Sequence, residues 1–261
     1  MKKLRSDTIK IIAMVAMLFD HIGYVILEKY YLSVPDMELA MKVFKVNSWV
    51  RGIGRIAFPL FCYMTVMGLI FTKSKWKYVK NLAIFTVVSE IPFNLATSGH
   101  VWDYKDQNVG FTLLLSALCM VLIDMAQEKF ELSRTSAIIF NTGMVTLFSI
   151  IAELIKSDYG GKGVIIIATM YLLRENRENM IKWGAVAFIA SMVFIMYLRY
   201  LNVPQLITYC NFEIIGIFAY PIMFMDTLKR KGGKALKWIG YSFYPVHQLI
   251  LFAIAKCMGV M

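Results

Sequence analysis

The stretch TIKIIAMVAMLFDHIGYVIL, residues 8–27, decides the fold class of this protein. It is long and apolar enough to cross a bilayer as an α-helix, which needs about 20 residues. It also carries an adjacent acid and base, Asp20 and His21, deep inside the apolar run. Titratable side chains are costly within a membrane, so their presence there indicates a functional site. The stretch therefore predicts a membrane-spanning helix that takes part in chemistry.

Apolar stretches of similar length recur along the whole chain. It has 261 residues, 59% of them hydrophobic, and a mean hydropathy of +0.61, whereas soluble domains are nearer half apolar. We therefore expect an all-α integral membrane protein, with about nine transmembrane helices in one bundle that forms a single domain over residues 1–261. The expected spans are 8–28, 52–72, 78–97, 109–126, 135–156, 160–174, 180–200, 209–227 and 235–258.

Three segments bear on the number of spans. The sixth span is short and opens with glycines at 160, 161 and 163, so we expect it to be partial or tilted. The longest connection, residues 29–51, is expected to be a loop with room for a short surface helix. Residues 1–5 are basic, but no small-residue cleavage site follows the first apolar stretch, so that stretch is expected to be a retained span.

The basic residues orient these spans, because cytoplasmic loops carry an excess of lysine and arginine. With the N-terminus inside, the C-terminus lies outside and 18 of the 28 basic residues fall on the cytoplasmic side. These are Lys2, Lys3, Arg5, Lys10, Lys73, Lys75, Lys77, Lys80, Lys129, Arg134, Arg174, Arg177, Lys182, Lys229, Arg230, Lys231, Lys234 and Lys237. The net charge of +11 is thus an orientation signal, and we expect membrane lipids but no nucleic acid as partners.

The four cysteines give no sign of a metal site. Cys62, Cys119, Cys210 and Cys257 lack the spacing of metal ligands. Cys62 and Cys119 lie inside expected spans, where cysteine usually serves as a small packing residue.

Ionisable side chains gather at one depth in this topology. His21 lies about 20 Å from the inner end of the first span, in the outer third of the bilayer. Other segments bring further groups to a similar depth, and charges in a membrane are usually paired with one another. These groups are Arg51, Arg55, Glu90, Glu153, Asp158, Arg199, Glu213 and His247. The alternative for those near helix ends is that they only reach toward lipid headgroups.

Prolines kink two of the spans beside these groups. Pro92 follows Glu90, and Pro245 lies between Tyr244 and His247. A proline within a helix leaves a carbonyl without its donor, which suits a helix that lines a cavity. We expect Tyr244 and His247 to line the acceptor site. The structural alternative is a core histidine that bonds to a neighbouring helix.

Lys10 and His21 lie on the same face of the first span. Eleven residues separate them, which is close to three full turns and about 16 Å along the axis. That distance is comparable to the reach of a coenzyme A pantetheine arm. The alternative for Lys10 is an orientation charge at the cytoplasmic mouth.

Several separated motifs resemble the TraX family of membrane proteins. They are Lys10 with Met17-Leu-Phe-Asp-His-Ile-Gly23, Gly54-Arg-Ile-Ala-Phe-Pro-Leu-Phe61, Ser89-Glu-Ile-Pro-Phe93, Phe111-Thr-Leu-Leu114, Asp158-Tyr-Gly160 with Gly163-Val164, and Phe243-Tyr-Pro-Val-His247. The first TraX protein described is tied to N-terminal acetylation of conjugative F pilin. The family is also similar to the broader transmembrane acyltransferases, in which an Arg or Lys, ten residues and a His mark the first span. Lys10 and His21 fit that spacing.

The resemblance implies acetyl transfer from acetyl-CoA in the inner (cytoplasmic) membrane of a bacterium. It leaves the acceptor open among a pilin-like peptide, an amino sugar and a surface glycan. Acyl transfer needs a base, and histidine has a suitable pKa, so we expect His21 to be the catalytic base and Lys10 to bind coenzyme A. Asp20 or Glu90 is expected to orient His21, because a base benefits from an orienting carboxylate.

Four further residues are expected to bind the acceptor. Arg51 and Arg55 suit a developing oxyanion or an acidic acceptor, and Glu153 and Asp158 lie at the same depth. Two other functions remain open. Buried His, Glu and Arg on kinked spans are equally typical of a secondary transporter or proton-coupled exporter, although no inverted repeat is evident. A non-catalytic assembly partner of a pilus or secretion system is the third possibility.

Overall fold

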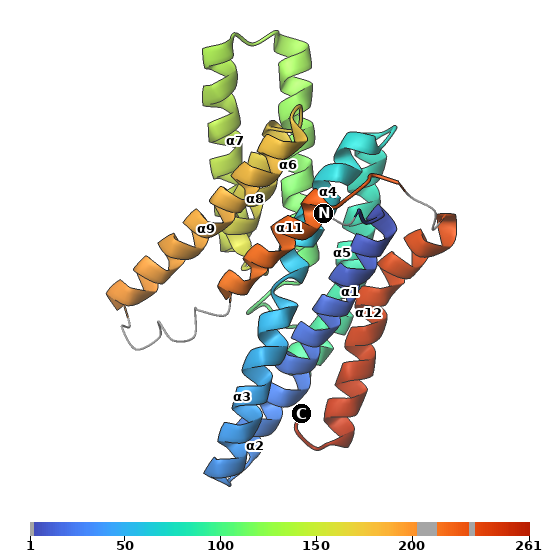
Figure 1. Ribbon diagram of the computed structural model, residues 1–261, viewed down its shortest axis with the longest axis vertical. Coiled ribbons are helices and arrows are strands. Elements are labelled where there is room, and N and C mark those ends of the chain that lie inside the picture. The colour runs from blue at the N-terminus through green and yellow to red at the C-terminus, as the bar shows by residue number, and fades with distance from the viewer. Residues whose placement is uncertain (1–2, 203–212, 230–232) are drawn as a thin grey trace. The chain divides into compact units, whose positions relative to one another are not determined.

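The structure is a computed structural model that describes residues 3–202, 213–229 and 233–261. Regular structure in these ranges is helical, apart from two isolated β-bridges, so the predicted all-α class is confirmed. In chain order the helices are α1 (Ser6–Ile22), η1 (Gly23–Glu28), α2 (Lys29–Ser33), α3 (Met37–Gly54), α4 (Ala57–Phe71), α5 (Lys75–Ser98), α6 (Val109–Phe130), α7 (Arg134–Leu154), α8 (Gly160–Leu172), α9 (Arg177–Asn202), η3 (Glu213–Phe218), α11 (Ala219–Phe224) and α12 (Gly233–Cys257) (Figure 1).

Four helical stretches in the described part are long and apolar enough to cross a membrane. They are Ser6–Ser33, Met37–Phe71, Val109–Phe130 and Arg134–Leu154. Three further helices, α5, α9 and α12, have 24, 26 and 25 residues. The larger count of about nine spans stays a prediction, and residues 209–212 of the expected span 209–227 lie outside the described residues.

One expected connection is mostly helical. Residues 29–51 were expected to form a loop with a short surface helix, but α2 and the 18-residue α3 fill most of this segment. Its charged residues lower the local hydropathy without preventing a helix. Asp36 begins α3 by accepting hydrogen bonds from the backbone N–H groups of Glu38 and Leu39, which is the role of an N-cap residue.

The chain divides into two compact units. The first unit comprises residues 1–61, 91–102 and 189–261, and the second comprises residues 62–90 and 103–188. Three of the four boundaries between the units fall within helices α4, α5 and α9, and the fourth, between residues 102 and 103, falls in the loop before α6. The single domain expected over residues 1–261 stays a prediction.

In the first unit, α3 packs antiparallel against α1 and η1 at two glycines. A Cβ added to Gly54 would lie 2.4 Å from the Cβ and 2.6 Å from the Cα of Asp20. A Cβ added to Gly23 would lie 2.5 Å from Cγ of Arg51 and 2.7 Å from Oδ1 of Asn47. Small residues allow this close approach of helices, which brings Arg51 toward the end of the first helix.

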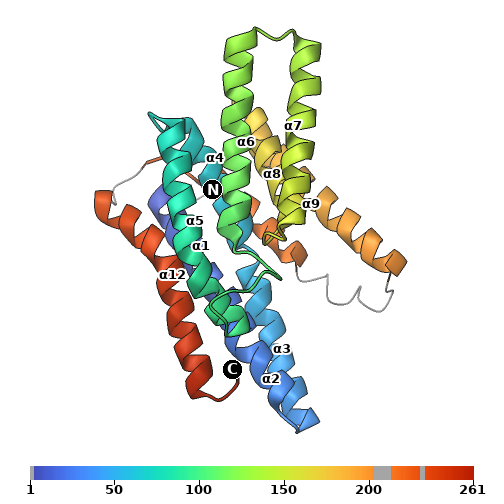
Figure 2. The same cartoon turned by 180° about the vertical axis from the view of Figure 1, so that it is seen from behind.

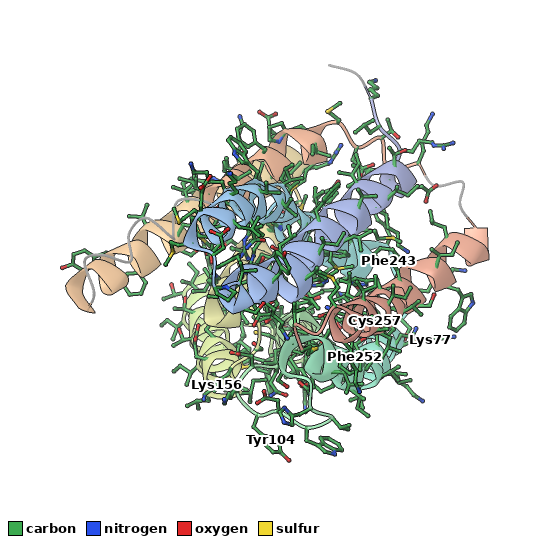
Figure 3. All side chains as sticks on the ribbon, turned by 90° about the horizontal axis from the view of Figure 1, so that it is seen from below. Lys77, Tyr104, Lys156, Phe243, Phe252 and Cys257 are labelled. Atoms are coloured by element: carbon green, nitrogen blue, oxygen red, sulfur yellow. The ribbon has the colours of Figure 1, made fainter. Side chains whose placement is uncertain are left out.

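The helix α12 runs parallel to α1. Lys10 Nζ donates to the Leu236 carbonyl at 2.8 Å. Eleven residues further along both helices, His21 contacts His247. Both contacts join residues that are 226 positions apart, so the two helices keep one register over this length. Figure 1 shows α1 and α12 side by side, and Figure 3 labels Phe243, Phe252 and Cys257 along α12.

Segments expected on the same side of the membrane lie together in the first unit. Near the N-terminus, Leu4 forms a β-bridge with Asp226, and Ser6 donates from Oγ to the Asp226 carboxylate at 2.8 Å. Toward the other end of α1, Val25 shares a hydrophobic cluster with Ala96 and Ala255. The expected topology, with the chain ends on opposite sides of the membrane and the N-terminus in the cytoplasm, stays a prediction.

In the second unit, α6 and α7 form a helical hairpin against which α8 packs (Figure 2). Loops expected outside also meet here, because Gln107 and Ser157 form a β-bridge. Asn108 begins α6 by accepting a hydrogen bond from Gly110 N–H at 2.8 Å. The sixth expected span is short as predicted, because α8 has 13 residues.

Candidate active site

The two histidines predicted for the site are in direct contact. Nδ1 of His21 on α1 lies 2.6 Å from Nε2 of His247 on α12. The ring centroids are 4.9 Å apart and the ring planes differ by 13°. The distance between the centroids equals the nitrogen–nitrogen distance plus the distance from centroid to nitrogen in each ring. The two centroids and the two nitrogens therefore lie nearly on one line, and the rings meet edge to edge in nearly one plane. The contact is therefore an in-plane hydrogen bond, which we call the histidine pair.

The backbone fixes the tautomers of the neutral histidine pair. His247 Nδ1 lies 2.7 Å from the Phe243 carbonyl, which can only accept, so this nitrogen carries the hydrogen. Nε2 of a neutral His247 is then an acceptor, and His21 must donate to it from Nδ1. The remaining nitrogen of His21, Nε2, carries a lone pair. His21 thus presents a lone pair on Nε2, and the hydrogen bond to His247 fixes the orientation of its ring.

Two neighbours on α12 hold the pair. Tyr244 is buried and its ring stands nearly perpendicular to both imidazoles, at 5.7 Å from His21 and 5.6 Å from His247. Gln248 is fully buried, and its amide nitrogen lies 3.1 Å and 3.4 Å from the two ring nitrogens of His21. Tyr244 was predicted to line the acceptor site, and the structure places it beside the histidine pair. Gln248 was not predicted.

A network of four charged residues lies beside the pair in the first unit. Arg51 donates from Nη1 to the Glu28 carboxylate, and its Nε lies 3.5 Å from Oδ1 of Asp20. Nε of Arg55 lies 3.9 Å from the same oxygen. We call Asp20, Glu28, Arg51 and Arg55 the charge network. Its two arginines and two carboxylates compensate one another, as charges within a membrane usually do.

The network changes the expected role of Asp20. Asp20 was one candidate to orient His21, but its ion pairs are with Arg51 and Arg55. The hydrogen-bonding partners of His21 are His247 and Gln248.

Lys10 is held against the last helix. Its ammonium group donates to the Leu236 carbonyl and lies where a Cβ of Gly240 would be, at 2.1 Å. Glycine at 240 therefore gives Lys10 room to pack across α12. The contact uses one of the three ammonium hydrogens. It also fixes the register of α1 and α12 that brings His21 to His247.

Three predicted site residues belong to the second unit, and their contacts stabilise helix starts. Glu90 accepts hydrogen bonds from the backbone and side chain of Asn108, which precedes α6. Glu153 accepts from Gly161 N–H at 2.8 Å, at the start of α8. Asp158 lies in the loop before α8, and its carbonyl accepts from Thr112. Their roles toward His21 and the acceptor stay predictions.

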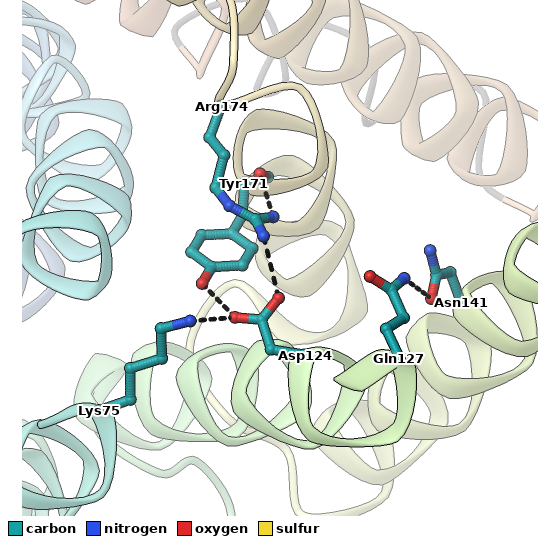
Figure 4. Close-up of polar contacts among 6 residues, drawn as sticks. All are labelled: Lys75, Asp124, Gln127, Asn141, Tyr171 and Arg174. Atoms are coloured by element: carbon teal, nitrogen blue, oxygen red, sulfur yellow. Dashed lines mark hydrogen bonds and ion pairs between the residues drawn. The ribbon is translucent and has the colours of Figure 1, made fainter. Parts of the chain in front are cut away.

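A second cluster of charges in the same unit escaped the sequence analysis (Figure 4). The buried Asp124 carboxylate accepts from Lys75 and Tyr171, each at 2.5 Å, and from Arg174 at 3.0 Å. Burial lowers the pKa of Lys75, but its hydrogen bonds to Asp124 and Tyr171 raise it by more, so the net shift is upward. Lys75 and Arg174 are thus part of a buried ion cluster as well as orientation charges.

Comparisons with known proteins agree with these motifs. The chain matches the family model described as TraX protein over residues 5–255. It is also similar to a protein of Dichelobacter nodosus described as probable fimbrial assembly protein FimC, serogroup H1. The two are 23% identical over 259 residues, which cover 93% of this chain and 92% of that protein. No solved structure matches. Because the family model spans nearly the whole sequence, this chain belongs to the TraX family.

Proposed function

We propose that this protein is a membrane-embedded acetyltransferase that moves an acetyl group from cytosolic acetyl-CoA to an amine or hydroxyl of an exported or surface acceptor. The observation that carries the proposal is the histidine pair. Its hydrogen bonds leave a lone pair on Nε2 of His21, at the position where the acyltransferase spacing from Lys10 predicts the base.

The reaction follows from this arrangement. The acceptor nitrogen or oxygen attacks the thioester carbonyl carbon while His21 Nε2 takes its proton. The carbon–sulfur bond then breaks, and the coenzyme A thiolate receives that proton from His21. The products are the acetylated acceptor and free coenzyme A. The hydrogen bond to His247 fixes the ring so that Nε2, rather than Nδ1, faces the reaction, which is the task of an orienting partner.

The charge network supplies the electrostatic part of the proposal. Its arginines lie close to His21 and are already paired with Asp20 and Glu28. A paired guanidinium is held in position, which suits it to stabilise charge that develops during the reaction. Arg51 and Arg55 are therefore proposed to stabilise the oxyanion or an acidic acceptor.

The donor is proposed to enter from the cytoplasm along the face of α1 shared by Lys10 and His21. Lys10 is then proposed to bind a coenzyme A phosphate, about 16 Å from the base along the helix. The protein is proposed to lie in the bacterial inner membrane with its N-terminus cytoplasmic. Because the similar D. nodosus protein is described as a fimbrial assembly protein, a pilin-like peptide is the first acceptor to test.

The proposal is tested with purified protein in lipid nanodiscs, acetyl-labelled acetyl-CoA and a synthetic pilin-like peptide with a free N-terminus. Labelled peptide is expected from the wild type. His21→Ala is expected to lose about 10²–10⁴-fold of the rate, as loss of a general base does. His100→Ala is the matched control, because His100 is exposed and hydrogen-bonds to Ser98, two residues before it.

The same assay separates the alternatives. Buried histidines and paired charges also suit a proton-coupled transporter. A transporter would bind or move a solute without releasing labelled acetyl groups, and an assembly partner would do neither. Absence of both peptide labelling and acetyl-CoA hydrolysis by the wild type would contradict the proposed function.

A further inference from the structure

Gln248 has no role in the mechanism so far, yet it lies against the proposed base. Its amide nitrogen is 3.1 Å from Nδ1 and 3.4 Å from Nε2 of His21. If the amide nitrogen lay in the plane of the His21 ring at these distances from Nδ1 and Nε2, it would overlap Cε1, the carbon between them. The amide nitrogen therefore lies over the face of the ring. It leaves the in-plane lone pair of Nε2 to the acceptor.

The other end of the amide is unsatisfied. Gln248 is fully buried, and its Oε1 has no hydrogen-bond partner among the described residues. A buried carbonyl oxygen without a donor costs free energy. Such an arrangement calls for an explanation, because most buried polar atoms in proteins are hydrogen-bonded.

We infer that Gln248 is a positioning residue that holds the neutral His21 ring with its N–H group and turns its carbonyl oxygen to that ring when His21 is protonated. The inference rests on the proposed function, in which His21 takes a proton. The face of a neutral aromatic ring is electron-rich and attracts the N–H end of an amide. A cationic ring instead attracts the negative carbonyl end. Rotation about the last side-chain bond exchanges the two ends without moving the rest of Gln248.

This rotation assists the reaction and not the binding of substrates. The oxygen that is unsatisfied beside neutral His21 becomes satisfied beside the imidazolium that forms as the acceptor attacks. An interaction that is stronger in the transition state than in the ground state raises kcat. The KM for acetyl-CoA should therefore be insensitive to Gln248.

The other groups that act on His21 carry or can take up charge. They are His247 from α12, Asp20 from α1, and Arg51 and Arg55 from α3. Gln248 is neutral and does not itself titrate. A change in pH dependence on replacement of Gln248 thus reports how well the protonated His21 is stabilised.

The test compares Gln248→Met and Gln248→Glu with the wild type in nanodiscs, with acetyl-CoA and the synthetic pilin-like peptide. Methionine keeps the length of the side chain and removes the amide, while glutamate keeps an oxygen and adds a negative charge. Leu249→Met is the control, since Leu249 is the next residue of α12 and faces outward. The rate is measured across the pH range in which imidazole titrates.

Gln248→Met is expected to lower kcat about tenfold, to leave the KM for acetyl-CoA unchanged, and to move the acid limb of the pH profile to lower pH. Gln248→Glu is expected to move that limb to higher pH. A purely structural role would lower kcat in Gln248→Met with the acid limb unmoved, which would overturn the inference. If Gln248→Met does not purify as a monodisperse protein, an unmoved acid limb in Gln248→Glu overturns the inference, because a carboxylate in contact with His21 must shift the protonation of that ring.

Different results would overturn the proposed function and the role of Gln248. A wild type that shows no acetyl-CoA turnover overturns the proposed function, and this inference with it. A wild type whose turnover depends on His21, together with Gln248 variants whose pH profiles match the wild type, overturns only the role of Gln248.

Discussion

Nδ1 of His21 and Nε2 of His247 lie 2.6 Å apart on parallel helices, although 226 residues separate them in the chain. The Phe243 carbonyl fixes the direction of this hydrogen bond. We therefore predict that both neutral histidines carry their hydrogen on Nδ1, the tautomer that is less common for free histidine. The chain has three histidines, so nitrogen NMR of ¹⁵N-histidine-labelled protein can resolve each ring, with His100→Asn to assign the third.

The same NMR experiment can also contradict the proposed tautomer of His21. A hydrogen on Nε2 of His21 at neutral pH would leave that nitrogen without a lone pair for the acceptor. The proposed orientation of the base would then be wrong, whatever the activity of the protein.

A second prediction concerns the close approach of α1 and α3. Gly54→Ala would place a methyl group against the backbone of Asp20, so the helices must separate and the charge network must shift. We expect a loss of about 1–3 kcal/mol in stability, typical of overpacking, and a loss of activity. Thermal unfolding in detergent measures the first and the acetyl-transfer assay the second.

Gly143→Ala is the matched control for this prediction. No atom lies within 4 Å of the position that its Cβ would occupy in α7, and alanine is the better helix former. Its melting temperature should equal or exceed that of the wild type. Equal melting temperatures for Gly54→Ala and the wild type would show that α1 and α3 do not meet as described.

A third prediction concerns the buried ion cluster of the second unit. Asp124→Asn removes the charge that compensates Lys75 and Arg174. Removal of one partner of a fully buried pair costs about 3–5 kcal/mol, and since both cations are about a third exposed we expect about 1–3 kcal/mol here. Glu178→Gln breaks the exposed Glu178–Lys182 pair and should leave the melting temperature unchanged. Equal melting temperatures for the two variants would contradict a stabilising role for the cluster.

A fourth prediction uses a native cysteine to test the topology. Cys257 at the end of α12 is exposed, whereas Cys62 and Cys119 are buried. In a Cys210→Ala background, a membrane-impermeant maleimide added to intact spheroplasts should label Cys257. Lys77→Cys, in a background that also lacks Cys257, should be labelled only after the membrane is opened. The reverse pattern would place the C-terminus in the cytoplasm.

Much of the histidine pair and charge network could be predicted from the sequence, because titratable residues are rare in apolar stretches. Depth along each helix follows from the residue number, and it placed His21, Arg51, Arg55 and His247 at one level. The structure brings these four together in the first unit. The position of a residue along its helix does not give the direction in which its side chain points. That direction depends on how the helices pack.

That limit explains what the sequence analysis missed. Asp20 seemed a partner for His21 because it is adjacent, but packing of α3 at Gly54 directs it toward arginines. Gln248 is uncharged and gave no signal in an apolar helix. Lys75 and Arg174 fit the pattern of orientation charges, so the sequence held no separate sign of their common partner Asp124.

The most direct test of the central claim is the rate of acetyl transfer by His21→Ala and His247→Ala, measured side by side against the wild type. If His21 is the base and His247 orients it, His21→Ala should lose about 10²–10⁴-fold of the rate and His247→Ala distinctly less. Wild-type activity should fall as the pH drops through the range in which imidazole takes up a proton. If His21→Ala keeps most of the activity while His247→Ala is inactive, the base lies on α12 and the assignment proposed for the pair is reversed.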